Sequence, residues 1–382
     1  MPKIYLDWAA TAIPNITENA KACEIATELF ANPSAKHELG KKARQRLEEA
    51  RKKIAQVLSV NSNEIFFTSG GTESDHIVIL SNIARNNFSD YSLAMSAVEH
   101  QALSENKKSL EKLGLEILTV PCDKSGFINA KTVLQKLKPN TNFVSIMTVN
   151  NELGNLQPIP QIAKALKERA GRKTFFHTDA VQAVGKNLFN IAELGVDALS
   201  LSGHKIGAMR GIGLLFLKNK IEVFNKGGNQ ESGIRSGTEN LAGVLSLQFA
   251  LEKYAKNFTQ NLELAYSKMN FLINEISKLP NFFILPQTRQ AESKNFSPYI
   301  LQLAHKKITG EIMVRVLSDK GFYISTGSAC SSSKLQRPVL DALGVSKELQ
   351  MNAFRISLGN ETSFDELKLF VKALKRVDEE FC

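Results

Sequence analysis

The strongest limit on the fold comes from an alternation that occupies residues 64–218. Short runs rich in β-branched and aromatic residues are separated there by helix-length amphipathic stretches. This pattern is typical of an α/β domain in which helices cover a largely parallel sheet. It predicts seven strands, at residues 64–68, 93–98, 115–120, 143–149, 174–178, 198–201 and 213–217.

The pattern changes after residue 240. Residues 241–279 read as two long helices without a strand, and Pro280 and Pro286 then interrupt the chain. Strands are predicted near 299–304, 321–325 and 354–357, with helices near 311–319 and 365–377. We interpret this part as a smaller α+β domain that follows the α/β domain.

Composition excludes several classes of protein. With 43% hydrophobic and 23% charged residues, the chain is neither disordered nor fibrous, and no apolar run of about 20 residues could span a membrane. The net charge of +10 is spread along the chain, so we expect no direct binding of nucleic acid. The chain reaches Asp7 before an apolar stretch of secretory-signal length, and its cysteines form no CxxC pair. These features predict a cytoplasmic protein without structural disulfides.

A glycine-rich turn, Ser69-Gly70-Gly71-Thr72, joins the strand at 64–68 to an apolar helical run. Free backbone N–H groups and the positive end of a helix dipole favour a bound phosphate at such a turn. Thr72 and Asp75 have the spacing of a capping box. A plain strand-to-helix turn uses the same residues, so this motif alone leaves both interpretations open.

Asp179 and Lys205 follow two predicted strands and are expected at their carboxyl ends. Ligands of open α/β sheets bind at that edge, so the two side chains can face one cavity. Pyridoxal phosphate needs a lysine to form a Schiff base and a carboxylate beside its pyridinium nitrogen. Either residue alone could equally be half of a surface salt bridge.

The whole chain resembles the cysteine desulfurases of the long-loop type, which are pyridoxal-phosphate enzymes that convert L-cysteine to L-alanine. The resemblance rests on blocks in family order: Tyr5-Leu6-Asp7, Asn32-Pro33-Ser34, Thr68 to Ser74, Glu99-His100, Asn150-Asn151-Glu152, Asp179 to Gln182, Ser202 to Lys205, Arg235 to Thr238, Gly327 to Ser332 and Arg355 to Gly359. It implies the fold of type I pyridoxal-phosphate transferases, similar to aspartate aminotransferase. It also implies an N-terminal segment at 1–15 that packs with the small domain, a large cofactor-binding domain at 16–255 and a small domain at 256–382.

The same resemblance assigns roles around the cofactor. Lys205 would carry the cofactor, Asp179 would pair with its ring nitrogen, and His100 would stack on the ring. The remaining implied contacts are the phosphate ligands Gly71, Thr72, Ser202 and His204, and the phenolic-oxygen partners Asn151 and Gln182. Thr238 would reach the phosphate of a neighbouring subunit, which implies a homodimer with composite sites. Arg355, together with Asn151, would bind the substrate, since a guanidinium presents two parallel donors to a carboxylate.

Cys330 lies among small polar residues, Gly327-Ser328-Ala329 and Ser331-Ser332-Ser333. Such a run predicts an exposed loop, and exposure is what a nucleophilic thiolate requires. By resemblance, Cys330 would take the substrate sulfur as a persulfide and pass it to a protein acceptor for iron–sulfur cluster assembly or tRNA thiolation. Cys23, on a predicted apolar helix, and Cys122, at a strand end, are assigned to structure.

Three alternatives share parts of this pattern. A selenocysteine lyase, or another β-eliminating pyridoxal-phosphate enzyme, would use every one of the cofactor residues. A basic nucleic-acid-binding or regulatory protein could retain an inactive fold, although Lys205, Asp179, His100 and Cys330 are all present. A Cys–His hydrolase would need a base beside Cys330, and only the fold could bring His305 there.

Overall fold

The computed structural model describes residues 3–84, 91–169, 173–327 and 337–381. Its central element is a seven-stranded sheet in the order β2-β8-β7-β6-β5-β3-β4. The strands are β2 (Ile65–Thr68), β3 (Ser92–Ser96), β4 (Glu116–Val120), β5 (Thr141–Ser145), β6 (Phe175–Asp179), β7 (Ala198–Ser202) and β8 (Gly213–Leu217). Only β8 pairs antiparallel with its neighbours β2 and β7 in this sheet. The predicted seven-stranded, mainly parallel sheet is therefore confirmed.

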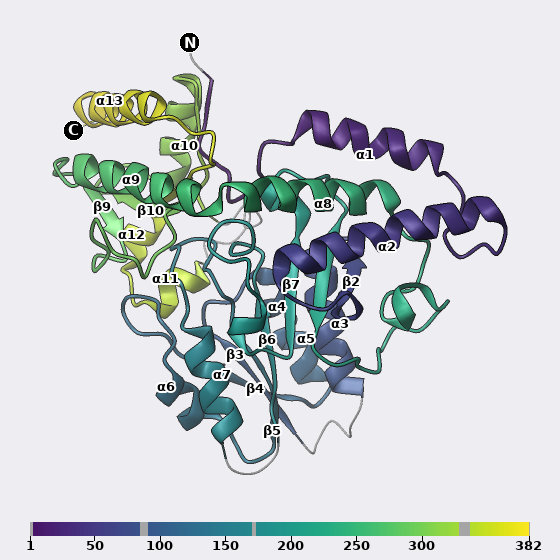
Figure 1. The fold of residues 1–382 in the computed structure, drawn as a ribbon. Coiled ribbons are helices and arrows are strands. Elements are labelled where there is room, and N and C mark those ends of the chain that lie inside the picture. The colour runs from purple at the N-terminus through teal and green to yellow at the C-terminus, as the bar shows by residue number, and fades with distance from the viewer. Residues whose placement is uncertain (1–2, 85–90, 170–172, 328–336, 382) are drawn as a thin grey trace.

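Alternating side chains explain why both faces of this sheet are covered. In β2, Ile65 and Phe67 join one buried cluster, whereas Phe66 joins another on the opposite face. The first face packs against α2 (Glu38–Leu58), α7 (Ile159–Glu168) and α8 (Leu241–Lys256), with α1 (Ile16–Glu28) against α8. The second face packs against α3 (Gly71–Ala84), α4 (Gln101–Ser104) and α5 (Lys107–Lys112). The result is the three-layered body in Figure 1.

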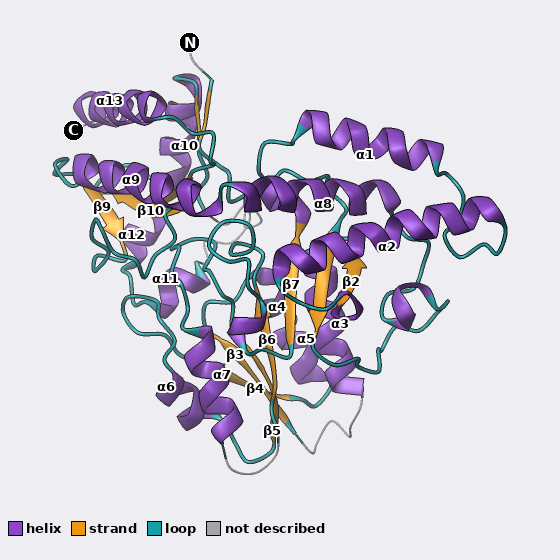
Figure 2. Cartoon of the chain, viewed as in Figure 1, coloured by secondary structure: helices purple, strands orange, loops and turns teal. Residues whose placement is uncertain are grey.

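The smaller α+β part has its own core. It contains an antiparallel sheet in the order β12-β10-β9 and a parallel pair of β1 with β11. Its strands are β1 (Ile4–Tyr5), β9 (Phe282–Leu285), β10 (Ile300–His305), β11 (Phe322–Tyr323) and β12 (Ala353–Ser357). Its main helices are α9 (Phe258–Ile276), α10 (Gly310–Asp319) and α13 (Phe364–Phe381), with the short α11 (Pro338–Ala342) and α12 (Lys347–Met351). Figure 2 separates these helices and strands by colour, and the remaining helix, α6 (Ala130–Lys136), lies beside α7.

Some predicted elements were wrong in extent or missing. The strand predicted at 143–149 ends at Ser145, although Ile146 and Thr148 still donate backbone hydrogen bonds to His177 and Asp179 of β6. The segment between Pro280 and Pro286 was read as an interruption, but it forms β9. The short β1, α11 and α12 were not predicted either.

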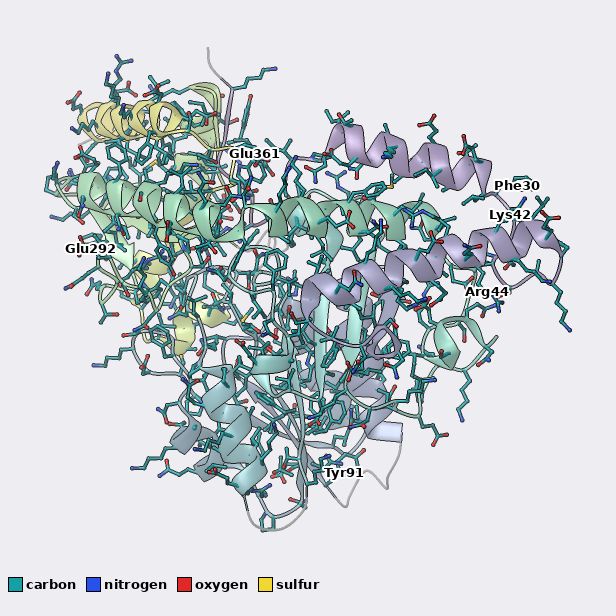
Figure 3. All side chains as sticks on the ribbon, in the orientation of Figure 1. Phe30, Lys42, Arg44, Tyr91, Glu292 and Glu361 are labelled. Atoms are coloured by element: carbon teal, nitrogen blue, oxygen red, sulfur yellow. The ribbon has the colours of Figure 1, made fainter. Side chains whose placement is uncertain are left out.

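Side chains fill the space between these layers, as Figure 3 shows. Tyr91, the residue directly before β3, is 1% exposed, whereas Phe30, beyond the end of α1, is 76% exposed. No helix of the described ranges is both long and apolar enough to cross a membrane.

Candidate active site

A cavity of about 260 Å³ opens at the carboxyl edge of the central sheet. Ten of the predicted site residues line it: Gly71, Thr72, His100, Asn151, Asp179, Gln182, Ser202, His204, Lys205 and Arg355. Asp179 ends β6 and Ser202 ends β7, so the parallel strands bring them to one edge. Thr238 does not line this cavity, and its side chain is exposed.

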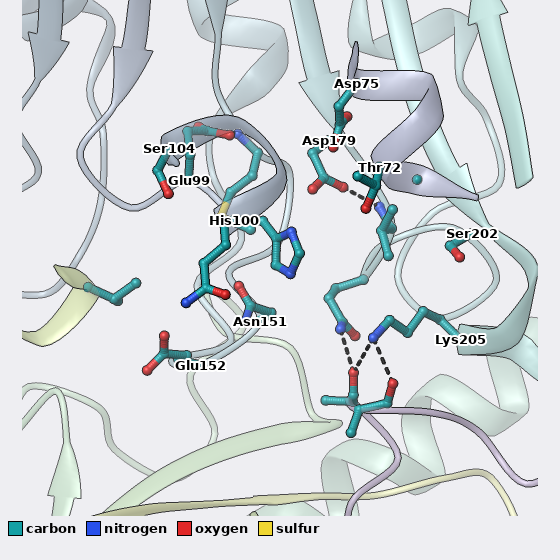
Figure 4. A pocket seen from close by; sticks show the side chains of 18 of the residues that line it. Thr72, Asp75, Glu99, His100, Ser104, Asn151, Glu152, Asp179, Ser202 and Lys205 are labelled. Atoms are coloured by element: carbon teal, nitrogen blue, oxygen red, sulfur yellow. Dashed lines mark hydrogen bonds between the residues drawn. The ribbon is translucent and has the colours of Figure 1, made fainter. Parts of the chain in front are cut away.

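The Lys205 amine is held from below by the N-terminal segment. Its Nζ donates hydrogen bonds to the carbonyl oxygens of Ala9 and Ala10, both at 2.8 Å (Figure 4). Burial, followed by the charge of Arg355, lowers the pKa of Lys205 to about 8. A substantial fraction of this amine is therefore neutral near physiological pH, as a nucleophilic lysine requires.

Asp179 and His100 lie on the opposite side of the cavity from the N-terminal segment (Figure 4). The Asp179 carboxylate accepts a hydrogen bond from the Val181 N–H at 2.9 Å. Burial raises the pKa of Asp179, and the charges of His100 and Lys205 oppose that rise. The Nδ1 of His100 accepts from the Ala102 N–H at 3.2 Å and burial lowers the pKa of its ring, so the neutral ring carries its proton on Nε2.

The turn after β2 requires a glycine at position 71, where it packs against Val181. A Cβ atom on Gly71 would lie 2.5 Å from Cγ2 of Val181, so only glycine fits there. Helix α3 begins at Gly71, and Gly71 and Thr72 of its first turn line the same cavity as Ser202. This arrangement suits a phosphate group.

The predicted capping box of Thr72 and Asp75 is wrong. The Glu73 carboxylate, not that of Asp75, accepts the hydrogen bond of the Ser69 N–H at this helix start. Asp75 is 1% exposed and lies 3.5 Å from Nε2 of the buried His177. The capping pattern failed because the helix begins at Gly71, one residue before the Thr72 that it would have used as the cap.

Arg355 comes from β12 of the smaller part of the chain and reaches into the cavity. Its Nη1 donates to the carbonyls of Asn151 at 2.8 Å and Gly327 at 3.1 Å, and its Nη2 donates to Asp7 at 2.9 Å. Burial raises the pKa of Asp7, and Arg355 opposes that rise. Arg355 is thus a buried cation at the edge of the cavity, 3% exposed.

The aminotransferase class-V family matches residues 4–370 of the chain. The chain belongs to this family. A cysteine desulfurase (IscS) of Dictyoglomus turgidum is 37% identical over 381 residues, which cover 99% of this chain and 95% of that protein. A solved NifS-like protein superposes with a TM-score of 0.90 at 29% identity, covering 98% of this chain and 99% of that one. A structure described as SspA in complex with cysteine has a TM-score of 0.80 at 29% identity, covering 94% and 100%.

The relatives place the chain among the cysteine desulfurases, and that family depends on pyridoxal phosphate. The cavity fits such a group. It offers a buried amine on Lys205, a buried carboxylate on Asp179, and a glycine cradle at the start of α3 for a phosphate.

Sequence reasoning missed three buried carboxyl groups that line the cavity: Asp75, Glu99 and Glu152. Glu99 accepts hydrogen bonds from the Ser96 hydroxyl at 2.5 Å and the Met147 N–H at 2.9 Å, and burial raises its pKa to about 8. Its position directly before His100 was the one signal that could have identified it.

The two cysteines within the described residues differ in burial, although both were assigned to structure. Cys330 and Cys382 lie outside the described residues. Cys23 was assigned to structure, but it lies on the exposed side of α1, because the inward position of that turn is taken by Ala22. Cys122 is half-buried and donates to the Ala342 carbonyl at 3.6 Å, and burial raises its pKa to about 11.

Proposed function

We propose that the protein is a cysteine desulfurase that removes sulfur from L-cysteine, leaves L-alanine and carries the sulfur as a persulfide on Cys330. The observation that carries the proposal is the meeting of three groups at one cavity: the amine of Lys205, the carboxylate of Asp179 and the guanidinium of Arg355. In the proposed reaction, Lys205 serves the chemistry at the amine of the amino acid, Asp179 holds the cofactor and Arg355 binds the carboxylate of the amino acid. The names of the relatives support the same activity.

Pyridoxal phosphate would be held by Lys205, with Asp179 at its ring nitrogen and His100 on its ring. Its other partners in the proposal are Gly71, Thr72, Ser202 and His204 at the phosphate, and Asn151 and Gln182 at the phenolic oxygen. When bound, this cofactor supplies an electron sink for the electrons released at the α-carbon. The Gln182 amide already donates from Nε2 to the Ala9 carbonyl at 2.8 Å and accepts at Oε1 from the Lys186 amine at 3.4 Å, so its second Nε2–H is the donor left for this role.

Lys205 is the group best suited to move protons at the α-carbon of the substrate. Its pKa near 8 lets it release and take up a proton near neutral pH. The Ala9 and Ala10 carbonyls accept hydrogen bonds from its charged form. His100, with a ring that burial keeps neutral, can donate from Nε2 to a group in the cavity.

In the proposed transfer of sulfur, the thiolate of Cys330 is the nucleophile. It attacks the substrate sulfur, so that an S–S bond forms as the C–S bond breaks. The electron pair of the broken bond stays with carbon and takes up a proton, which gives alanine. Gly327 and Pro338, on either side of the segment that carries Cys330, both line the cavity.

The proposal includes a homodimer, in which Thr238 serves the phosphate site of a second subunit, and a protein that accepts the sulfur in the cytoplasm. Thr238 is exposed and away from the cavity of its own chain, as a residue that serves another subunit would be. We also propose the division of the chain into an N-terminal segment at 1–15, a large domain at 16–255 and a small domain at 256–382.

The test is alanine release from L-cysteine by the purified, cofactor-loaded protein under reducing conditions. Lys205→Ala should abolish release, and Cys330→Ala should abolish it while leaving the cofactor bound. Cys23→Ala is the matched control, because Cys23 is an exposed thiol on α1 and should not matter. Normal release by Cys330→Ala would refute the nucleophile. Release from selenocysteine but not from cysteine would identify a selenocysteine lyase instead.

A further inference from the structure

The hydrogen bonds of Arg355 leave part of its guanidinium without a partner among the described residues. Three of its five N–H groups are used, two on Nη1 for the carbonyls of Asn151 and Gly327 and one on Nη2 for Asp7. Nε is buried and has no partner among the described residues. Nε–H and one Nη2–H therefore remain for a second acceptor, and a guanidinium can bind more than one carboxylate oxygen in this way.

Asp7 already supplies a negative charge to the same guanidinium. Its Oδ1 lies 2.9 Å from Nη2, and the two side chains are 21% and 3% exposed. Asp7 is not among the residues that line the cavity, whereas Arg355 is, so the aspartate contacts the guanidinium from outside. Its main chain is held in place, because its carbonyl accepts from the Tyr5 hydroxyl at 3.0 Å and the residue forms a β-bridge with Ser357, the last residue of β12.

Asp7 is the one carboxylate of the described residues that forms an ion pair with Arg355. Glu152 is a second buried acid near this cation, but the charge of Arg337 acts on it more strongly than that of Arg355, and burial raises its pKa. No hydrogen bond between Glu152 and Arg355 is present in the described structure. The charge of Arg355 is therefore balanced by Asp7 before any ligand arrives.

We infer that Asp7 is a resident counter-ion that weakens the grip of Arg355 on the carboxylate of a bound amino acid and so favours release of the product. The inference rests on the proposed function, in which Arg355 binds the substrate carboxylate. A carboxylate bound by Arg355 would share one guanidinium with Asp7. Two anions beside one cation repel each other, so each binds less tightly than it would alone.

Thermodynamic linkage makes this role measurable. Without Asp7, the unliganded protein holds a buried cation without its counter-ion, and that state is destabilised. A bound carboxylate restores the balance, so the stability lost in the free protein returns as tighter binding. A residue that merely supported the local structure would weaken binding when removed, which is the opposite sign.

The experiment compares L-alanine with ethylamine, which is alanine without its carboxylate. Binding of both to the cofactor-loaded protein is measured by calorimetry at pH 8 for the wild type and for Asp7→Asn, which keeps the shape and the acceptor oxygen. We expect Asp7→Asn to bind L-alanine about tenfold more tightly and ethylamine unchanged. Without ligand, the variant should unfold at a lower temperature than the wild type, and saturating L-alanine should close that gap.

Glu380→Gln is the matched control, since it removes a carboxylate from the Lys320–Glu380 pair of the same 2.9 Å length in the smaller part of the chain. It should change neither affinity. If Asp7→Asn does not fold, Asp7→Ser makes the same comparison.

Unchanged or weaker L-alanine binding, or an equal change for both ligands, would overturn the inference. A wild type that binds ethylamine as well as L-alanine would overturn it together with the role of Arg355. A wild type that releases alanine from cysteine but whose Asp7→Asn variant gains no affinity would refute this inference alone.

Discussion

The ion pair of Arg51 with Glu231 should contribute more to stability than the other ion pairs described for this protein. Both Glu231 oxygens accept from Arg51, from Nη1 and Nη2 at 2.7 Å each, and Oε2 also accepts from the Phe67 N–H at 2.8 Å. The two residues are 7% and 6% exposed, and the guanidinium lies 4.5 Å from the centre of the Phe67 ring. Glu231 has a left-handed backbone with φ of 46°. Side-chain bonds of this quality are needed to hold such a conformation.

The perturbation is Glu231→Gln, which keeps the shape and leaves Arg51 charged in a buried site. Removing one partner of a buried pair costs about 3–5 kcal/mol. Unfolding entropy of about 2.1 cal/mol/K per residue gives roughly 0.8 kcal/mol/K for this chain of 382 residues. A loss of about 4 kcal/mol should therefore lower Tm by about 5 °C.

Thermal unfolding followed by circular dichroism measures this change, with Glu48→Gln as the control. Glu48 contacts the same Arg51 at 3.1 Å, but its side chain is 47% exposed, so its loss should cost less than about 1 kcal/mol. In a double-mutant cycle with Arg51→Met, the two substitutions should cost clearly less together than the sum of the single variants. A Tm within about 1 °C of wild type for Glu231→Gln, or additivity within about 0.5 kcal/mol, would refute the reasoning.

Three further predictions follow from burial at titrating groups. Uptake of pyridoxal phosphate by the cofactor-free protein should rise with pH to half its maximum near 8, because only the neutral Lys205 amine attacks an aldehyde; a midpoint near the ordinary value of 10.5 would contradict the lowered pKa. Burial lowers the pKa of His177 to about 3, so its neutral form stabilises the fold above its ordinary value of 6.5 and that stability is lost as pH falls toward 3. His177→Gln should therefore show a shallower loss of Tm between those values, and an identical acid profile would disprove this. Iodoacetamide at pH 8 should alkylate Cys23 well before Cys122, whose raised pKa near 11 keeps it protonated, and peptide mass spectrometry showing equal rates would count against it.

Local pattern sufficed for the central sheet, because each strand there is a short apolar run whose alternate residues enter opposite cores. In β8, Leu214 and Phe216 join one core and Leu215 and Leu217 join the other, so a continuous apolar stretch is what two covered faces require. The same logic failed for β9, because the prolines beside it read as breaks. Pro286 lies just beyond the last strand residue, Leu285, where it costs the ladder no hydrogen bond.

Some residues of the candidate site could be predicted from the sequence, and others could not. Residues at strand ends, such as Asp179 and Ser202, could be placed because sheet topology fixes where strand ends meet. Asp75 could not, because its burial depends on β6 and β7, which contribute His177 and Ser200 around it. The capping-box pattern considers only residues close in sequence, so it could not reveal contacts of Asp75 with residues of distant strands.

The most distant contacts explain why the N-terminal turn matters more than its sequence suggests. The carbonyls of Ala9 and Ala10 hold the Lys205 amine, and the side chain of Asp7 holds Arg355, 348 positions away along the chain. The two cations are thus restrained by one short segment that pairs with β11 at one end through β1. The large part of the chain supplies Lys205 and the smaller part supplies Arg355, so this turn contacts both of the groups to which the proposed function assigns the amine and the carboxylate of one substrate.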